Sequence, residues 1–175
     1  MKVVAFAASS SRNSINKRLV AYAAGFLKEA EIELLDINDF ELPLFSVDRE
    51  AELGQPELAK LFLQKLGNAD AILIAFAEHN LSYSVAYKNL FDWCSRIDPK
   101  VFQGKPMVLL ATSPGGRGGQ TVLATALESA PRFGGEVKAS LSIPSFNSNF
   151  DSLKEELTND ELKAKLSETM NSLLD

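Results

Sequence analysis

Two kinds of hydrophobic pattern alternate along the chain. Continuous apolar runs at residues 2–8, 71–75 and 106–112 are typical of strands that helices cover on both faces. Shorter strands are predicted at residues 31–36 and 136–140. Between the strands, apolar residues recur every three or four positions, which is the spacing of one helix face. The chain is therefore predicted to alternate strands with helices throughout its length.

Five helices are predicted from this spacing. The first begins at residues 14–16, the second takes Pro56 as its first helical residue, and the third is capped by Ser84. Their apolar faces contain, in order along the chain, Ile15, Leu19, Ala23, Phe26 and Leu27; Leu58, Phe62, Leu66 and Ala69; Ala86, Leu90, Trp93, Cys94 and Ile97; Leu123, Ala126, Leu127 and Ala130; and Leu162, Leu166, Met170 and Leu173.

The segment from residue 37 to residue 48 does not fit either pattern. It contains the turn-forming residues Asn38, Asp39 and Pro43 next to the apolar Leu42, Leu44 and Phe45. Such a segment is too apolar for a simple linker. It either covers a ligand, contacts a partner subunit or folds back on its own core.

Strands that alternate with helices favour a parallel sheet with helices on both faces, because parallel strands need right-handed crossover connections. Two strand orders compete, the Rossmann order and the flavodoxin-like order 2-1-3-4-5. Five strand–helix units rather than six favour the second. We predict one α/β domain over residues 1–175, a flavodoxin-like three-layer sandwich with a five-stranded parallel sheet. Its ligand site should lie beyond the carboxyl ends of the first and third strands.

A polar loop joins the first strand to the first helix. It contains Ser9, Ser10, Ser11, Arg12, Ser14 and Asn16. The first N–H groups of a helix have no intrahelical partner, and the helix dipole places partial positive charge there, so this junction attracts anions. The hydroxyls, the amide and the guanidinium add donors. A phosphate site is predicted; a turn that only caps the helix is the alternative.

Two further loops leave the sheet at the same edge, after the third and fourth strands. The first of them carries Glu78, His79, Asn80, Ser82 and Tyr83, and the other reads SPGGRGG at residues 113–119. Glycine lets backbone N–H groups approach a flat or charged ligand closely, although a plain turn also explains it. A phosphate at the first loop and a flat, polar-edged group between the other two describe flavin mononucleotide (FMN).

Composition and charge exclude other classes of function. The 18 Lys and Arg residues are scattered and outnumbered by 23 Asp and Glu, which argues against nucleic-acid binding. No apolar stretch reaches the ~20 residues of a membrane helix, and no signal-peptide cleavage pattern is present, so a cytoplasmic location without membrane contact is expected. Cys94 and His79 are the only cysteine and histidine, so a disulfide and a His/Cys metal site are not expected, and Cys94 should be a core residue.

Three stretches resemble the NADPH-dependent FMN reductase family, a flavodoxin-like group that includes FMN, quinone, chromate and azo reductases. The family's first loop reads glycine-serine-x-arginine, two residues, serine, x and asparagine; here it is Ala8, Ser9, Ser10, Ser11, Arg12, Asn13, Ser14, Ile15 and Asn16. The second reads proline-glutamate-tyrosine-asparagine, then serine and a lysine-asparagine pair before tryptophan; here it is Ala77, Glu78, His79, Asn80, Ser82, Lys88, Asn89 and Trp93. The third, serine-proline-glycine-glycine, is matched by Ser113, Pro114, Gly115 and Gly116. The resemblance extends to about residue 140.

The resemblance implies which residues bind the cofactor. Ser9, Ser11, Arg12, Ser14 and Asn16 would bind the FMN phosphate, Glu78, His79, Asn80, Ser113, Gly115 and Gly116 the ring, and Ile15 and Pro114 complete the cofactor-binding set. The sequence departs from the pattern where Arg12 stands one place late behind Ser11, and where Ala77 and His79 replace proline and tyrosine. Beside a flavin, His79 either donates a hydrogen bond or a proton to a substrate, or only fills space as a bulky side chain.

The resemblance also implies an activity. Hydride would pass from NADPH or NADH to FMN, and then to a quinone, a free flavin, an azo compound or a metal ion, with no side chain assigned as catalytic because the flavin carries the chemistry. Relatives are homodimers or homotetramers in which one subunit helps to cover the other's flavin, and residues 42–45 are a candidate contact. A flavodoxin-type electron carrier and a flavin-free binding module on the same fold are the alternatives.

Overall fold

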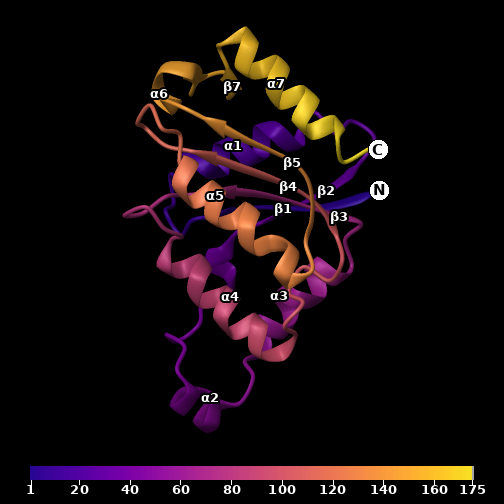
Figure 1. Cartoon of the computed structure of the whole chain (residues 1–175), viewed down its shortest axis with the longest axis vertical. Helices are drawn as coiled ribbons and strands as arrows, with labels where there is room; N and C mark the ends of the chain where they lie inside the picture. The colour runs from indigo at the N-terminus through magenta and orange to yellow at the C-terminus, as the bar shows by residue number, and fades with distance from the viewer. Residues whose placement is uncertain (175) are drawn as a thin grey trace.

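A five-stranded parallel sheet of order β2-β1-β3-β4-β5 forms the middle layer of the protein (Figure 1). The computed structural model describes residues 1–174; Asp175, the last residue of the predicted domain, lies outside the described residues. The strands are β1 Lys2–Ala8, β2 Glu31–Leu35, β3 Ala71–Phe76, β4 Pro106–Thr112 and β5 Glu136–Ile143. The predicted strand order and fold class are confirmed.

Helices cover both faces of this sheet (Figure 1). On one face lie α1 Ile15–Ala24 and α7 Asp160–Asn171; on the other lie α3 Glu57–Gly67, α4 Val85–Ile97 and α5 Gln120–Ser129. Successive strand residues serve opposite faces, so that Val4 and Phe6 pack towards α3–α5 while Val3 and Ala5 pack towards α1 and α7. Because both faces are buried, the inner strands are almost entirely apolar.

Some element boundaries were predicted wrongly. Pro56 is the N-cap of α3 rather than its first helical residue, since its ψ of 140° is extended. Strand β5 continues to Ile143 instead of ending at Ser140. This edge strand pairs only with β4, and its half-exposed Ser142 interrupts the apolar run that marks the inner strands.

Several short elements lie outside the five predicted units. They are the 3₁₀ helices η1 Ile37–Phe40 and η2 Ala130–Phe133, the helices α2 Val47–Leu53 and α6 Phe146–Asn149, and the hairpin of β6 Phe150–Asp151 and β7 Glu156–Leu157. Figure 1 shows α2 projecting away from the sheet. None of its residues is buried, so it has no apolar periodicity to reveal it. No helix within residues 1–174 is both long and apolar enough to cross a membrane.

The apolar segment before α2 packs largely on α4. The Phe45 ring lies 5.1 Å from that of Trp93, whose indole N–H donates to the Pro43 carbonyl over 2.7 Å. Asn89 accepts from the Phe45 N–H at 2.8 Å. The expectation that this segment folds back on the core therefore holds for Phe45, whereas Leu44 remains 63% exposed.

Cys94 is a core residue, as predicted, and should be chemically inert in the folded protein. Its thiol is fully buried and faces the Ala59 carbonyl at 3.7 Å, and burial raises its pKa to about 12. Because the thiolate is the reactive form, we expect no labelling by Ellman's reagent at pH 8 in the folded state and complete labelling in guanidinium chloride. Stoichiometric labelling of protein that keeps its native circular dichroism would contradict this.

Candidate functional site

Three loops meet at the carboxyl edge of the sheet. The first loop, residues 9–14, follows β1; the second loop, residues 77–84, follows β3; the third loop, residues 113–119, follows β4. Their strands are neighbours in the sheet, and hydrogen bonds join them. The Ser84 hydroxyl donates to the Ala8 carbonyl at 2.8 Å, and the Glu78 carboxylate accepts from the Val122 N–H at 2.8 Å. One site can therefore draw on all three loops.

The first loop presents a series of free backbone donors. Within residues 1–174, the N–H groups of residues 12–16 donate to no other protein group. The Ser14 side chain caps α1 by accepting from the Lys17 N–H at 3.3 Å, which leaves the Ser14 hydroxyl proton able to donate elsewhere. Successive unpaired N–H groups at the start of a ten-residue helix form an anion-binding concavity.

Arg12 supplies the positive charge that remains available at this loop. The nearby Lys17 ammonium is paired with the Asp36 carboxylate at 2.6 Å. Burial raises the pKa of Asp36, but hydrogen bonds from Lys17 and Asn38 outweigh burial and hold that pKa below its ordinary value, so the pair stays charged. Arg12 is exposed and forms no ion pair within residues 1–174. Of Lys17 and Arg12, only Arg12 thus has no carboxylate partner within residues 1–174 and is free to bind an anion.

The other predicted phosphate ligands differ in exposure. Ser11 is exposed, whereas Ser9 is 2% exposed and its hydroxyl accepts from the Ser11 N–H at 3.3 Å. Asn16 is 3% exposed; its amide donates to the Thr112 carbonyl at 3.2 Å and accepts from the Thr112 N–H at 3.1 Å. Asn16 therefore fixes α1 against the end of β4, a positioning role that the sequence did not reveal. A direct side-chain contact with phosphate stays a prediction.

The second loop ends in a tight turn. The His79 N–H donates to the Ser82 carbonyl at 2.9 Å, and the Ser82 N–H donates to the His79 carbonyl at 3.1 Å. Between them, Asn80 and Leu81 have φ of 52° and 64°. Two successive positive φ angles define a type I′ turn, which is uncommon for a leucine. The side chains of His79 and Asn80 are exposed at its tip, whereas Glu78 is committed to the start of α5. The predicted ring-binding residues thus divide into an exposed tip and an anchor.

The glycines of the third loop divide in a similar way. Gly118 and Gly119 are buried with positive φ, and a Cβ on Gly118 would lie 2.8 Å from the Ile143 carbonyl oxygen. A Cβ on Gly116 would meet nothing within 4 Å, and one on Gly115 would meet only the Ser113 hydroxyl at 3.9 Å. The fold therefore requires Gly118 but not Gly116. The exposed 114–116 stretch leaves open space above its backbone, as a flat ligand would need.

Beside the first and second loops lies a cavity of about 390 Å³. Its polar lining comes from Ser10, Asn38, Glu41 and Asn89, and its apolar lining includes Leu44, Val85 and Leu90. The Asn38 amide donates to the Ser10 carbonyl at 3.2 Å, which ties the segment after β2 to the first loop. Val85 was not predicted at the site, because it belongs to no polar or glycine-rich loop pattern, whereas Asn38 lies in the 37–48 segment for which covering a ligand was one alternative. Residues 1–174 contain no group of three or more His, Cys, Asp and Glu side chains suited to a metal ion.

Comparison with known proteins identifies similar sequences. The sequence model of one family, described as NADPH-dependent FMN reductase, matches residues 1–143. The chain is 35% identical over 125 residues to NADPH:quinone oxidoreductase of Arabidopsis thaliana, covering 69% of this chain and 62% of that protein. It is 34% identical over 119 residues to 2-hydroxy-1,4-benzoquinone reductase of Burkholderia sp, covering 67% and 63%. The matches span less than two thirds of these relatives' lengths.

Solved structures show the same fold. The flavoenzyme NAD(P)H:(acceptor) oxidoreductase of Paracoccus denitrificans superposes with a TM-score of 0.79 at 24% identity, covering 99% of this chain and 95% of that one. The apo form of an NADH:FMN oxidoreductase superposes with a TM-score of 0.70 at 19% identity, covering 98% and 87%. At these identities the likeness concerns the fold.

Proposed function

Because the chain belongs to the NADPH-dependent FMN reductase family, we propose that it binds FMN at the three loops and transfers hydride from NADPH or NADH to a quinone. The observation that carries the proposal is the first loop, where the N–H groups of residues 12–16 are free and the Arg12 side chain of the same stretch is exposed without an ion pair. Bound flavin would supply the hydride chemistry, and the protein would bind and orient it.

The first loop would hold the phosphate. Its backbone N–H groups can donate hydrogen bonds to the phosphate oxygens, and the dipole of α1 favours a negative charge at the same point. The Arg12 guanidinium adds a charge-assisted contact, and the hydroxyls of Ser11 and Ser14 add neutral donors. The Asn16–Thr112 hydrogen bonds keep this loop in a fixed position relative to the third loop.

The second and third loops would hold the ring. The open backbone at Gly115 and Gly116 lets a flat group lie close to its N–H groups, and the exposed Asn80 amide can donate and accept at the ring edge. The Glu78 bond to the start of α5 fixes the distance between the two loops. The exposed imidazole of His79 could reach a substrate on the solvent side of the ring.

The finer parts of the proposal concern acceptors and assembly. Quinones are named for the relatives that match this chain, so they are the first acceptors to test, followed by free flavin, azo compounds and metal ions. We also propose a homodimer or homotetramer in the cytoplasm. Its support is the exposure of Leu44, Leu81 and Val85 at 63%, 61% and 74%, close to the first and second loops.

Replacing Arg12 by alanine tests the phosphate contact. We expect the FMN dissociation constant to rise by a factor corresponding to about 1.5–3 kcal/mol, the usual contribution of a hydrogen bond to a charged group. Titration of the apoprotein with FMN, followed by flavin fluorescence, measures this change. NADPH oxidation with added quinone then tests the reaction: an enzyme turns over, whereas an electron carrier does not.

Arg132→Ala is the matched control. Arg132 is also exposed, but it precedes β5 and so lies at the opposite edge of the sheet from the three loops. Its replacement should leave the FMN dissociation constant unchanged. If Arg12→Ala binds FMN as tightly as Arg132→Ala, the phosphate lies elsewhere; if neither variant nor the native protein binds FMN, the proposed function is wrong.

A further inference from the structure

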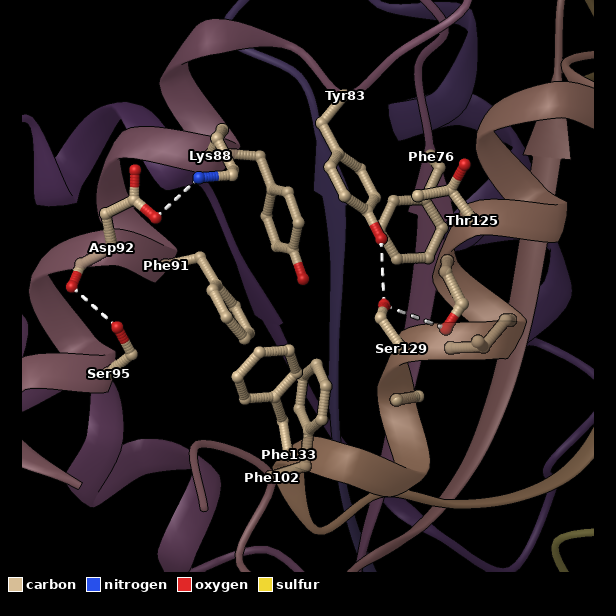
Figure 2. A pocket seen from close by; sticks show the side chains of 14 residues that line it. Phe76, Tyr83, Lys88, Phe91, Asp92, Ser95, Phe102, Thr125, Ser129 and Phe133 are labelled. Carbon is tan, nitrogen blue, oxygen red and sulfur yellow. Dashed lines mark hydrogen bonds and ion pairs between the residues drawn. The ribbon is translucent and has the colours of Figure 1, made fainter. Parts of the chain in front are cut away.

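A separate cavity of about 240 Å³ lies between α4 and α5. Six aromatic side chains line it: Phe76, Tyr83, Tyr87, Phe91, Phe102 and Phe133. Figure 2 shows Phe91, Phe102 and Phe133 gathered on one side and Phe76 and Tyr83 on another. The residues that α5 contributes, including Ala126 and Ser129, are small. Large side chains on α4 thus face small ones on α5, and the space between them is not filled.

The Tyr87 hydroxyl has no partner in this cavity. Tyr87 is 4% exposed, and within residues 1–174 its hydroxyl neither donates nor accepts a hydrogen bond. Burial raises its pKa well above the ordinary value, so it is a neutral donor. Within residues 1–174, Tyr22 holds the one fully enclosed side-chain oxygen without a partner, so the Tyr87 hydroxyl still opens onto the cavity, where a bound molecule can accept its proton. By contrast, the Tyr83 hydroxyl is 3.2 Å from that of Ser129, a contact drawn in Figure 2.

The charged groups of the lining satisfy each other. Lys88 and Asp92, one turn apart on α4, pair at 2.6 Å, as Figure 2 shows. The Ser95 hydroxyl donates to the Asp92 carbonyl at 2.8 Å. An ionic ligand would therefore leave water without finding an unpaired opposite charge. The lining favours a neutral molecule.

We propose that this cavity binds a small neutral aromatic molecule with one hydrogen-bond acceptor, whose oxygen receives the Tyr87 hydroxyl proton. The aromatic lining offers edge-to-face contacts: the rings of Phe91 and Phe133 are 4.8 Å apart at 81°, and those of Phe76 and Tyr87 are 5.4 Å apart at 84°. The volume suits one ring. The cavity shares Tyr83 with the second loop, but no residue of the first or third loop lines it.

A water molecule fits this cavity less well. An ordered buried water needs about two to four polar partners. The nearby Ser129 hydroxyl is already engaged with Tyr83 and with the Ala126 carbonyl at 3.3 Å. Among the other polar side chains of the lining, Lys88 pairs with Asp92, and the hydroxyls of Ser95 and Thr125 donate to main-chain carbonyls. Tyr87 is left as the main partner for a water molecule. An aromatic ligand satisfies the hydroxyl and the walls together.

Two probes of equal size test the proposal on the full chain saturated with FMN. One is 4-fluoroacetophenone, which carries an acceptor oxygen; the other is 1-fluoro-4-isopropylbenzene, which carries a methyl group in its place. Binding is followed by ¹⁹F NMR without NADPH. We expect Tyr87→Phe to weaken 4-fluoroacetophenone binding roughly fivefold, as for loss of one neutral hydrogen bond, and to leave the isopropyl probe unchanged. Ala126→Leu, which fills the cavity, should abolish binding of both.

Several results would overturn the proposal. They are no saturable binding to the native protein, equal losses for both probes in Tyr87→Phe, or unchanged binding in an Ala126→Leu variant whose circular dichroism and melting temperature show it folded. If Ala126→Leu instead fails to fold, the probe difference in Tyr87→Phe alone decides. Sedimentation equilibrium adds one outcome: a dimer that Tyr87→Phe weakens would show that a second copy occupies the cavity, and would also overturn the proposal.

Discussion

Replacing Asn16 by alanine is expected to lower the free energy of unfolding by about 2–6 kcal/mol. Asn16 is 3% exposed, and its amide both donates to and accepts from the main chain of Thr112. Alanine would leave a buried N–H and a buried C=O without partners, and each costs about 1–3 kcal/mol. Urea denaturation of native and variant protein measures the change.

Asn13→Ala is the control for this prediction. Asn13 has the same side chain, lies in the same loop and is exposed, so its replacement should change the free energy of unfolding by no more than about 0.5 kcal/mol. If Asn16→Ala is no more damaging than Asn13→Ala, the two bonds to Thr112 do not hold α1 against β4.

The inner strands could be predicted because burial on both faces leaves a continuous run of apolar residues in the sequence. Strand β4 was predicted at its observed bounds, Pro106–Thr112, since helices cover both of its faces and nearly every residue is apolar. The edge strand β5 lacks that trace, and three of its residues were missed. Helix α2 buries no residue at all, so no hydrophobic pattern could have predicted it.

The site was predictable as three loops but not as a set of contacts. Strand order and loop composition indicate that residues after β1, β3 and β4 share one edge. The anchoring roles of Asn16 and Glu78 could not be predicted, because their partners are main-chain groups 96 and 44 residues away. Any residue type except proline would offer the same N–H at the partner position. The sequence therefore does not allow these two contacts to be predicted.

The cavity between α4 and α5 illustrates the same limit. Helical spacing correctly assigns Ala126 and Ala130 to an inward face. It does not show that the side chains facing them leave a volume of about 240 Å³ unfilled, since that depends on where the two helices sit on the sheet. Hydrophobic periodicity predicts which residues of a helix face the core, but not how far apart two neighbouring helices lie.

Gly118→Ala should be among the most destabilising substitutions in the chain, whereas Gly116→Ala should be nearly neutral for stability. Gly118 has φ of 58°, and an added Cβ would lie 2.8 Å from the Ile143 carbonyl oxygen, so alanine meets both backbone strain and a clash. We expect a loss of about 2–4 kcal/mol in the free energy of unfolding. At Gly116 a Cβ meets nothing within 4 Å. Thermal and urea unfolding measure both variants.

The same pair separates folding from ligand binding within one loop. If the flavin ring lies on the open backbone of the third loop, the Gly116 methyl group would occupy space that the ring needs, and the FMN dissociation constant should rise by a factor corresponding to about 1–3 kcal/mol. A folded Gly116→Ala variant that binds FMN as tightly as the native protein would show that the ring does not contact this residue. Equal stability of the two variants would instead contradict the requirement for glycine at residue 118.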